Sequence, residues 1–315
     1  VNPPEVDPSI ELKSYYHAEV LLIDLENKYL ELLGVPYTNI SKSVEVKRLV
    51  NGELVDATLN DLLIGANNVY VAIDSDNYIR KIIIDGESVF NYIRVAIRNS
   101  INDIADESTL VHNKVTFDIP FDTVIKSYDN SKSVNISAGT LVQFTIENNK
   151  IKLEGRGILE YFDKRVIVEE GNGEIKVSSI TRAHGTPTYA GKMDVSIKDS
   201  KLLLINEVNM EEYLRKVVPS EMPTSWHMEA LKSQAVAART YAYREIYNKK
   251  YDSLGYVVDD STMSQVYNNQ RTNDRSDQAI RETKGITMFN NGLPIIAYYY
   301  STSSGLTANG NEVWI

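Results

Sequence analysis

Over the first two thirds of the chain, hydrophobic residues occur in short runs that are separated by polar turns. Runs of this length, bounded by turn residues, are typical of β-strands. The clearest runs lie at 20–25, 29–34, 69–73, 79–84, 93–97, 115–119, 142–146, 166–168 and 202–205. Residues typical of tight turns lie among them at 51–52, 74–77, 85–86, 148–149 and 171–173. This part of the chain is therefore predicted to be built of β-strands.

The pattern changes at Asn209, after which apolar residues recur at helical spacing. Asn209 is a good N-cap, and Glu212 three residues later is close to a capping box, so we predict a short helix over 209–215. A longer helix is predicted over 226–249, where one apolar stripe repeats every three or four positions. A third helix over 274–284 would end before a glycine, which favours the left-handed conformation that follows a helix.

A hairpin is predicted next, because 286–289 and 293–300 flank the turn residues 290–292. Helices that come late in a mostly antiparallel β chain indicate the α+β class. Three parts are expected: a loose tail rich in proline and acidic residues, a small β-rich accessory module (the N-terminal module), and a larger domain. Their boundaries are 1–14, 15–90 and 91–315.

Composition narrows the class of protein. The chain is 43% hydrophobic and 24% charged, as ordinary globular proteins are, and no apolar run approaches the ~18 residues of a membrane helix. A net charge of −10 argues against nucleic-acid binding, because phosphate contacts depend on Lys and Arg. The absence of cysteine excludes disulfides and thiolate metal sites. The chain begins at Val1 without an apolar signal segment, so we expect a mature or trimmed form of an exported protein.

The strongest candidate for chemistry is Glu221, within Val217-Val218-Pro219-Ser220-Glu221-Met222-Pro223. Prolines restrain the backbone on both sides, and apolar neighbours favour a carboxyl group that keeps its proton, which suits a general acid. Spacing alone allows a second interpretation, because acidic residues at helix starts are common and are favoured by the helix dipole.

Two further segments carry candidate binding residues. On the long helix Lys232 and Arg239 share a face, with Gln234 and Tyr241 as further candidates, although a solvated face explains the same pattern. After the last predicted strand, 298–307 combines tyrosines with hydroxyl residues and a glycine. Aromatic rings can stack on sugars and hydroxyls can bind sugar hydroxyls, but a polar loop after an edge strand is the simpler alternative.

Taken together, these segments resemble a known family. Residues 203–214, Pro219-Ser220-Glu221-Met222-Pro223, the helix segment 229–242, Gln265-Val266-Tyr267 and 301–307 are similar, in this order, to motifs of the stage II sporulation protein D (SpoIID) family. That family also contains the amidase-enhancer proteins called LytB. The resemblance covers roughly 93–314 and is specific after Asn206, whereas the N-terminal module has no counterpart in it.

The resemblance implies a peptidoglycan lytic transglycosylase outside the cytoplasm. Such enzymes cleave between N-acetylmuramic acid and N-acetylglucosamine without water and leave a 1,6-anhydro sugar. Glu221 matches the catalytic glutamate, which acts first as acid and then as base. The substrate is expected to be glycan strands already stripped of stem peptides. The candidate substrate-binding residues are Lys232, Gln234, Arg239, Tyr241, Tyr267, Tyr300, Ser301, Ser303, Gly305 and Thr307.

The chain also departs from the family pattern. Some members bind zinc through Cys and His in a segment that matches 259–267 here, where the Cys and His positions are replaced and Asp259 alone could not hold zinc tightly. We therefore predict no metal and no cofactor. Tyr300 and Ser304-Gly305 stand where the family often has histidine and a double glycine. Relatives usually continue beyond the position of Ile315, so we expect the domain to be incomplete at this end.

Two rival functions follow from the same resemblance. The protein could bind glycan without cleaving it and stimulate a cell-wall amidase, with the N-terminal module docking that partner or the wall. Alternatively, Glu221 could support hydrolysis, which would leave a reducing-end sugar in place of the anhydro end.

Overall fold

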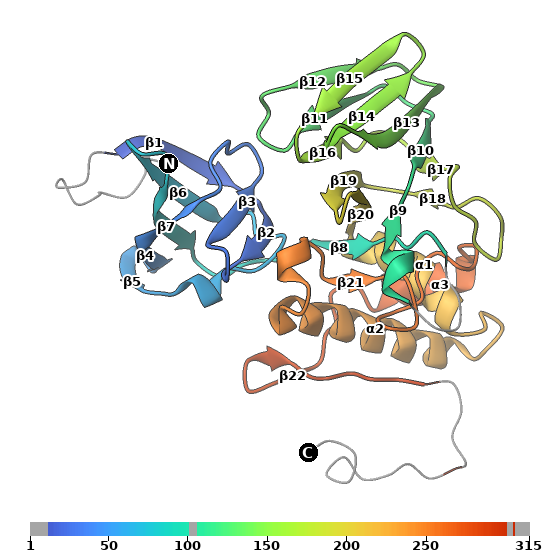
Figure 1. Cartoon of the computed structure of the whole chain (residues 1–315). Coiled ribbons are helices and arrows are strands. Elements are labelled where there is room, and N and C mark those ends of the chain that lie inside the picture. Colours follow the sequence, from blue (N-terminus) through green and yellow to red (C-terminus); the bar gives the residue numbers. More distant parts are fainter. Residues whose placement is uncertain (1–11, 101–105, 301–304, 306–315) are drawn as a thin grey trace.

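The computed structural model describes residues 12–100, 106–300 and 305. Figure 1 shows the N-terminal module beside a larger body, in which the sheets lie on one side and three helices on the other. Nearly all strand pairs are antiparallel; the exceptions are β4 with β7 and β8 with β21. This architecture confirms the α+β prediction.

The N-terminal module contains one twisted sheet and one separate hairpin. The sheet follows the order β1 (Leu12–Ala18), β6 (Val69–Asp74), β7 (Ile79–Asp85), β4 (Ile40–Val50) and β5 (Glu53–Asp56). The hairpin consists of β2 (Val20–Asp24) and β3 (Tyr29–Leu32). Asn51 and Gly52 both have positive φ and join β4 to β5, which confirms the predicted turn.

Two sheets make up the upper part of the body. The first follows the order β15 (Ile158–Phe162), β14 (Lys150–Gly155), β13 (Thr140–Glu147), β10 (Val115–Ile119), β17 (Ile175–Val177) and β18 (Thr188–Tyr189). The second follows the order β12 (Ser133–Ile136), β11 (Thr123–Ser127), β16 (Arg165–Val168), β19 (Lys192–Lys198), β20 (Lys201–Asn209), β8 (Tyr92–Ala96) and β21 (Val258–Asp259), with β9 (Val111–His112) beside β20.

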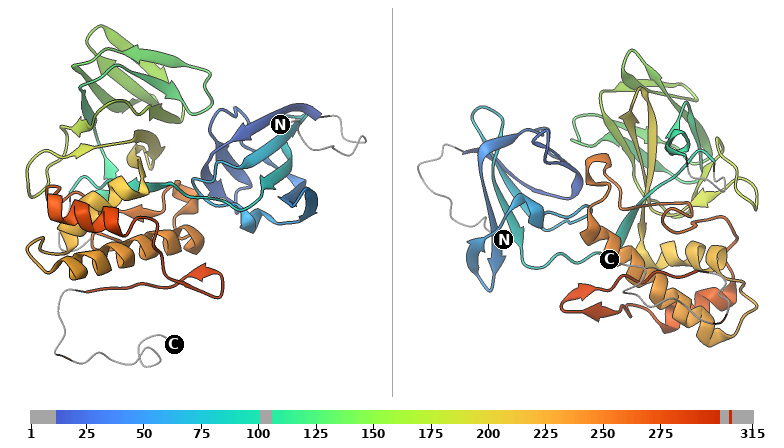
Figure 2. Two further views of the ribbon diagram at one scale, coloured as in Figure 1. Left: turned by 180° about the vertical axis from the view of Figure 1, so that it is seen from behind. Right: turned by 60° about the horizontal axis from the view of Figure 1, so that its bottom comes forward.

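The helices lie below the second sheet and follow directly from its longest strand. They are α1 (Met210–Glu221), α2 (Met228–Asn248) and α3 (Asp274–Glu282). α2 buries the stripe that its sequence predicted, with Leu231, Ala235, Ala238 and Ala242 all at 0% exposure. After α3, the short hairpin of β22 (Phe289–Asn290) and β23 (Leu293–Pro294) leads into a segment that runs along α2 on the side away from the sheets (Figures 1 and 2).

Some sequence predictions need correction. The first helix does not stop at Arg215 but continues through Pro219 to Glu221. Proline lacks an N–H group, but in the last turn it removes only one helical hydrogen bond, and the buried Val217 and Val218 keep this turn packed against the core. The glycines at 171–173 do not form a hairpin turn, because they connect β16 and β17, which belong to different sheets.

Two further turns differ from the sequence pattern. The Asp85-Gly86 pair ends β7 and leads out of the module instead of turning back. The predicted hairpin over 286–300 forms strands only at β22 and β23, with one further backbone hydrogen bond of 3.0 Å from the N–H of Ile295 to the carbonyl oxygen of Met288. Pro294 at the end of β23 cannot donate to a ladder, which limits the pairing.

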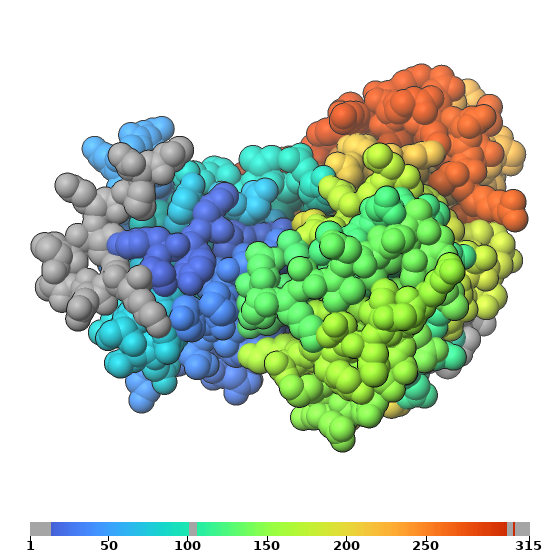
Figure 3. Space-filling view, turned by 90° about the horizontal axis from the view of Figure 1, so that it is seen from above, coloured from blue at the N-terminus to red at the C-terminus, as the bar shows by residue number. Residues whose placement is uncertain are grey.

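The N-terminal module packs tightly on the body, and the two surfaces adjoin in the space-filling view of Figure 3. One continuous hydrophobic core includes residues from both parts, among them Leu32 and Val166. Gly255 has φ +81°, and a Cβ atom there would lie 2.6 Å from the carbonyl oxygen of Leu21. Only glycine fits this approach of the two backbones without strain.

A buried ion network crosses the same contact. Glu31 of β3 binds Arg165 of β16 with an oxygen–nitrogen distance of 2.6 Å, and both side chains are almost fully buried. Arg165 also binds Asp194 at 2.5 Å, and Arg94 binds both Asp194 and Glu207. Because an unpaired buried charge is costly, each member of this network depends on the others.

Candidate active site

Glu221 is the last residue of α1, and the sequence explains why the helix holds it there. The Oδ1 atom of Asn209 accepts a hydrogen bond of 3.0 Å from the N–H of Glu211 and caps the start of the helix. Leu214, Val217 and Val218 bury one face against the core. The helix ends at Glu221, because the next residue, Met222, has an extended backbone. Glu221 therefore lies at the carboxyl end, where the helix dipole disfavours a negative charge.

The Glu221 carboxyl is half-buried and has two hydrogen-bond partners. The N–H of Val266 donates to Oε1 at 2.6 Å, and the Tyr299 hydroxyl is a second partner. Burial raises the pKa of Glu221 above the ordinary range of a glutamate, while these two hydrogen bonds partly oppose the rise. A carboxyl group that is partly desolvated and held in one position suits a general acid.

Behind Glu221 lies a chain of buried polar groups. The Tyr213 hydroxyl donates to Oε1 of Gln265 at 2.9 Å, and the amide nitrogen of Gln265 donates to the Tyr299 oxygen at 2.9 Å. An amide NH₂ can only donate, so the Tyr299 oxygen is an acceptor here and its own hydrogen is available to Glu221. The network thus leaves the Tyr299 hydroxyl as a donor to Glu221, which stabilises the ionised form of Glu221.

In front of Glu221 is an open cleft of about 680 Å³. Its walls are the segment after α1, a loop between α2 and α3, and one histidine between β17 and β18. The lining residues are His184, Pro219, Ser220, Glu221, Met222, Pro223, Thr224, Ser225, Gln270, Arg271, Thr272 and Asn273. The cleft is large enough for a sugar unit, and Glu221 is the only carboxyl group among the described residues that line it.

Ser220 connects the two walls of this cleft. Its hydroxyl donates to the carbonyl oxygen of Lys216 at 2.6 Å, and its oxygen accepts the N–H groups of Asn269 and Gln270, each at 3.1 Å. Asn273 then caps α3 by accepting from the N–H of Arg275 at 3.0 Å. The loop opposite Glu221 is therefore fixed at both ends.

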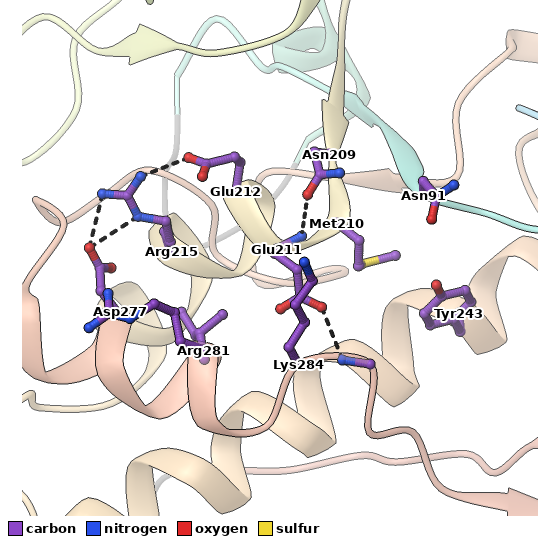
Figure 4. A pocket seen from close by; sticks show the side chains of 12 residues that line it. Asn91, Asn209, Met210, Glu211, Glu212, Arg215, Tyr243, Asp277, Arg281 and Lys284 are labelled. Carbon is purple, nitrogen blue, oxygen red and sulfur yellow. Dashed lines mark hydrogen bonds and ion pairs between the residues drawn. The ribbon is translucent and has the colours of Figure 1, made fainter.

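A second cavity, of about 600 Å³, lies at the opposite end of α1 (Figure 4). It shares no lining residue with the Glu221 cleft. Arg215 bridges Glu212 and Asp277 across it with distances of 2.8 and 2.9 Å. Glu211, also in this cavity, accepts from the N–H of Gly285 and pairs with Arg239. These paired charges connect α1 to α3 and α2 and do not resemble a catalytic arrangement.

Comparison with known proteins finds a family match over the segment that contains Glu221. Residues 198–289 match the family described as "SpoIID: Stage II sporulation protein". This range includes β20, all three helices and every residue that lines the Glu221 cleft except His184. This segment is therefore similar to the SpoIID family, and the larger body that contains it is named the SpoIID domain after this match. The resemblance to this family that the sequence motifs indicated is confirmed.

Relatives with curated descriptions share the same region. The "Amidase enhancer" of Bacillus subtilis (strain 168) is 43% identical over 101 residues, which are 32% of this chain and 13% of that protein. An uncharacterized protein of Brachyspira hyodysenteriae is 36% identical over 132 residues, 42% of this chain and 35% of the relative. "Stage II sporulation protein D" of Bacillus subtilis is 35% identical over 124 residues, 35% of this chain and 36% of the relative. The chain thus spans roughly an eighth to a third of their lengths.

The SpoIID domain buries several residues that the sequence suggested as sugar contacts. Arg239 is 0% exposed, and its guanidinium binds Glu211 at 2.7 and 3.0 Å and the carbonyl oxygen of Ile286 at 3.1 Å. Tyr267 is also 0% exposed and donates to Asn206 at 2.8 Å. In this arrangement neither offers a surface to a ligand. The helical spacing placed Arg239 on one face with Lys232. It could not reveal that Glu211 on α1 is the partner of Arg239.

The other candidates on α2 lie outside the Glu221 cleft. Gln234 and Tyr241 are 7% and 9% exposed, and the Tyr241 ring lies 6.1 Å from the ring of Tyr298. Lys232 is more accessible, but its ammonium group binds Glu229 at 2.9 Å and Glu282 at 2.7 Å. Lys232 therefore connects α2 to α3 in this structure.

The C-terminal candidates are placed only in part. Tyr300 is 63% exposed at the end of the segment that carries Tyr299. Gly305 is described as a single residue with φ +102°. Ser301, Ser303 and Thr307 lie outside the described residues.

The segment that matches the family's zinc-binding stretch carries ion pairs here. Asp259 is fully buried and accepts from Arg98 at 3.1 Å, and Asp260 pairs with Arg182 at 2.5 Å. Both carboxylates are therefore used within the SpoIID domain. In the described part of the chain, no group of three or more His, Asp or Glu side chains is arranged to hold a metal ion.

Several site residues were not identified from the sequence. Tyr299 is the middle member of a Tyr298–Tyr300 run from which only Tyr300 was selected, and Gln265 was recognised as part of a motif without a role. Val266 acts through its backbone N–H, which no side-chain pattern can reveal. His184 and Arg271 enter the cleft from loops that are far from Glu221 in sequence.

Proposed function

We propose that the SpoIID domain is a peptidoglycan lytic transglycosylase with Glu221 as its acid and base. The observation that carries the proposal is the half-buried Glu221 carboxyl, which has a raised pKa and is the sole acid among the described residues that line an open cleft. The match to the SpoIID family and the similarity to a stage II sporulation protein D support the proposal, because the resemblance to this family implies the same activity.

In the proposed reaction, protonated Glu221 donates its proton to the oxygen that links N-acetylmuramic acid to N-acetylglucosamine. The bond between this oxygen and C1 breaks, and positive charge develops on the muramic acid ring. The Glu221 carboxylate then takes the proton of the C6 hydroxyl as O6 bonds to C1. The products are a 1,6-anhydro end and a free hydroxyl end, and Glu221 is protonated again.

The neighbours of Glu221 fit both of its roles. Burial favours the protonated form that starts the reaction, and the donors from Val266 and Tyr299 stabilise the carboxylate that exists between the two proton transfers. Donors that are already in place need no reorganisation during the reaction. A single carboxyl group is sufficient because the nucleophile belongs to the sugar itself.

A second function is supported by a separate observation. The "Amidase enhancer" of Bacillus subtilis has 43% identity to this chain over the matched residues. In this alternative the domain binds glycan without cleaving it, and a cell-wall amidase is the partner. Both functions require export, so we propose an extracytoplasmic location. Among the described helices, none combines the length and apolar character needed to cross a membrane.

Glu221→Gln separates these functions. The amide keeps the size of the side chain but cannot donate and recover a proton, so the variant should release no anhydro-muramic ends from purified glycan while still binding it. Mass spectrometry of the digest measures the ends. If neither protein cleaves, and both raise the activity of an added amidase equally, the enhancer function replaces the enzyme.

A further inference from the structure

The Glu221 cleft has one permanent cation, Arg271. Of the twelve residues that line the cleft, all described, Glu221 is the only acid and Arg271 the only Lys or Arg. Arg271 is exposed, and its side chain has no hydrogen bond or ion pair with the described residues. Its neighbour Arg275, in contrast, donates to the carbonyl oxygens of Thr224 and Trp226 at 3.0 and 2.7 Å.

The backbone around Arg271 is held in place, although no described residue forms a hydrogen bond or ion pair with its side chain. The N–H groups of Asn269 and Gln270 bind Ser220, directly before Glu221. Asn273 on the other side caps α3. The Asn269 side chain also accepts the N–H of Ala183, at 3.0 Å, which connects the loop to the segment that carries His184. Arg271 is thus a cation at a defined position next to the proposed catalytic residue.

The other groups that face the cleft do not neutralise this charge. Arg271 does not form an ion pair with Glu221 among the described contacts, and it does not contribute to the pKa of Glu221. His184 is partly desolvated and lies near Lys216, Arg271 and Arg182, which together lower its pKa. The imidazole is therefore neutral at neutral pH, and Arg271 remains the cation available to a ligand.

The proposed substrate carries one matching group. The sugar rings of peptidoglycan are uncharged, and muramic acid has a single lactyl carboxyl group on each unit. In a strand with stem peptides this group forms an uncharged amide bond with the peptide, whereas in a peptide-free strand it is a carboxylate. A guanidinium presents a planar pair of donors that fits a carboxylate and strengthens the hydrogen bonds by its charge.

We propose that Arg271 is a specificity-determining residue that selects glycan strands with a free lactyl carboxylate in the Glu221 cleft. This inference rests on the proposed function. It gives a structural cause for a preference for peptide-free strands. A carboxylate bound near Glu221 also favours the protonated acid that starts the reaction.

The test compares Arg271→Gln with Arg281→Gln on two forms of the same glycan. Arg281 is a matched control, since it is an exposed arginine of α3 without an ion pair among the described residues and lines the second cavity. One glycan is enzymatically stripped of peptides, and the other is stripped and then converted to lactyl methylamides. The release of anhydro ends gives kcat/KM, and binding is measured with the same substitutions in the Glu221→Gln background.

Arg271→Gln should lower kcat/KM on the carboxylate glycan about tenfold or more, mainly through KM, and leave the methylamide glycan unchanged. Arg271→Lys should recover part of the loss, and Arg281→Gln should match the wild type. An equal loss on both glycans, or no loss on either, would overturn the proposal.

If the wild type released no anhydro ends from any glycan, the transglycosylase would be refuted, and the binding series would still decide the role of Arg271. Weaker binding of the carboxylate glycan alone would then support selection by Arg271. Unchanged binding would exclude it.

Discussion

At the scale of single residues, the central feature is the pair of donors that meet at Glu221. The Tyr299 hydroxyl lowers the pKa of Glu221 against the larger effect of burial. Tyr299→Phe should therefore raise the pKa of Glu221 further. Because a general acid must be protonated, the decline of kcat/KM at high pH should shift to higher pH, and the carboxylate intermediate should be less stable, so the maximal rate should fall.

A pH profile of anhydro-end release tests this prediction. The control is Tyr300→Phe, which removes a hydroxyl from a neighbouring exposed ring. An unchanged pH profile in Tyr299→Phe, with a normal maximal rate, would show that Tyr299 has no part in the chemistry.

Arg239 and Lys232 show how burial changes the contribution of an ion pair to stability. Arg239→Gln leaves Glu211 without its buried partner, and we expect a loss of about 3–5 kcal/mol in the free energy of unfolding. The Lys232 ion pairs are more exposed, so Lys232→Gln should cost at most about 1 kcal/mol. Urea unfolding followed by circular dichroism measures both. A fully stable Arg239→Gln that no longer binds glycan would restore the role in the sugar groove that its sequence suggested.

At the scale of elements, the sequence correctly predicted which residues of α2 are buried, but it did not predict the ion pairs that α2 forms with α1 and α3. The alanine-rich stripe follows from helical periodicity, because a helix has a fixed repeat and must bury one face. The same regularity identified β10 at its observed bounds and the β13–β14 turn at Asn148-Asn149. Local signals failed where tertiary contacts decide the outcome. α1 continues through Pro219 because its last turn is packed, and the glycines at 171–173 connect two sheets instead of two paired strands.

A close approach between elements makes Gly255 a test of module docking. Gly255→Ala would place a methyl group 2.6 Å from the carbonyl oxygen of Leu21 at a positive φ, so both backbone strain and steric conflict should destabilise the protein. The matched control is Gly285→Ala, which has φ +74° but no atom within 4 Å of the added carbon. Thermal unfolding should show a larger loss for Gly255→Ala than for Gly285→Ala. Equal losses would show that the contact with Leu21 adds nothing.

At the scale of the whole molecule, the N-terminal module is joined to the SpoIID domain by buried charge. Two acids of the module, Glu19 and Glu31, meet cations of the body at Lys192 and Arg165. The network also contains Arg94, Asp194 and Glu207, so four acids face three cations. Burial, reinforced by Glu207, raises the pKa of Glu19 to about 8. The surplus negative charge is thus relieved by one proton at neutral pH.

This proton makes stability depend on pH in a defined direction. The folded protein keeps a proton on Glu19 up to about pH 8, whereas the unfolded chain loses it near the ordinary value of 4.5. Stability from this group is therefore complete below about pH 4.5 and is lost as the pH rises toward 8. Glu19→Gln should remove this dependence and be more stable than the wild type at pH 8. Urea unfolding of both proteins at pH 5 and pH 8 measures the difference, and parallel losses in the two proteins would contradict the assignment.

How much of the molecule the sequence could predict also depends on scale. The family resemblance came from local motifs and their order, and the fold class came from the hydrophobic pattern; both are confirmed. The choice of Glu221 came from the same motifs and stays a prediction. The ion network and the donors to Glu221 could not, because Glu31 and Arg165 are 134 residues apart and Val266 lies 45 residues from Glu221. That residues 15–90 form a separate module remains a prediction. Their hydrophobic core and their buried ion pairs are continuous with those of the body.

The most direct test of the account is a digest of peptide-free glycan in water enriched in ¹⁸O, analysed by mass spectrometry for the wild type and Glu221→Gln. Because O6 of the sugar is the nucleophile, the wild type should produce 1,6-anhydro ends that contain no ¹⁸O, and Glu221→Gln should produce none. Reducing ends that carry ¹⁸O would show hydrolysis instead, and anhydro ends from Glu221→Gln at the wild-type rate would remove Glu221 from the centre of the mechanism.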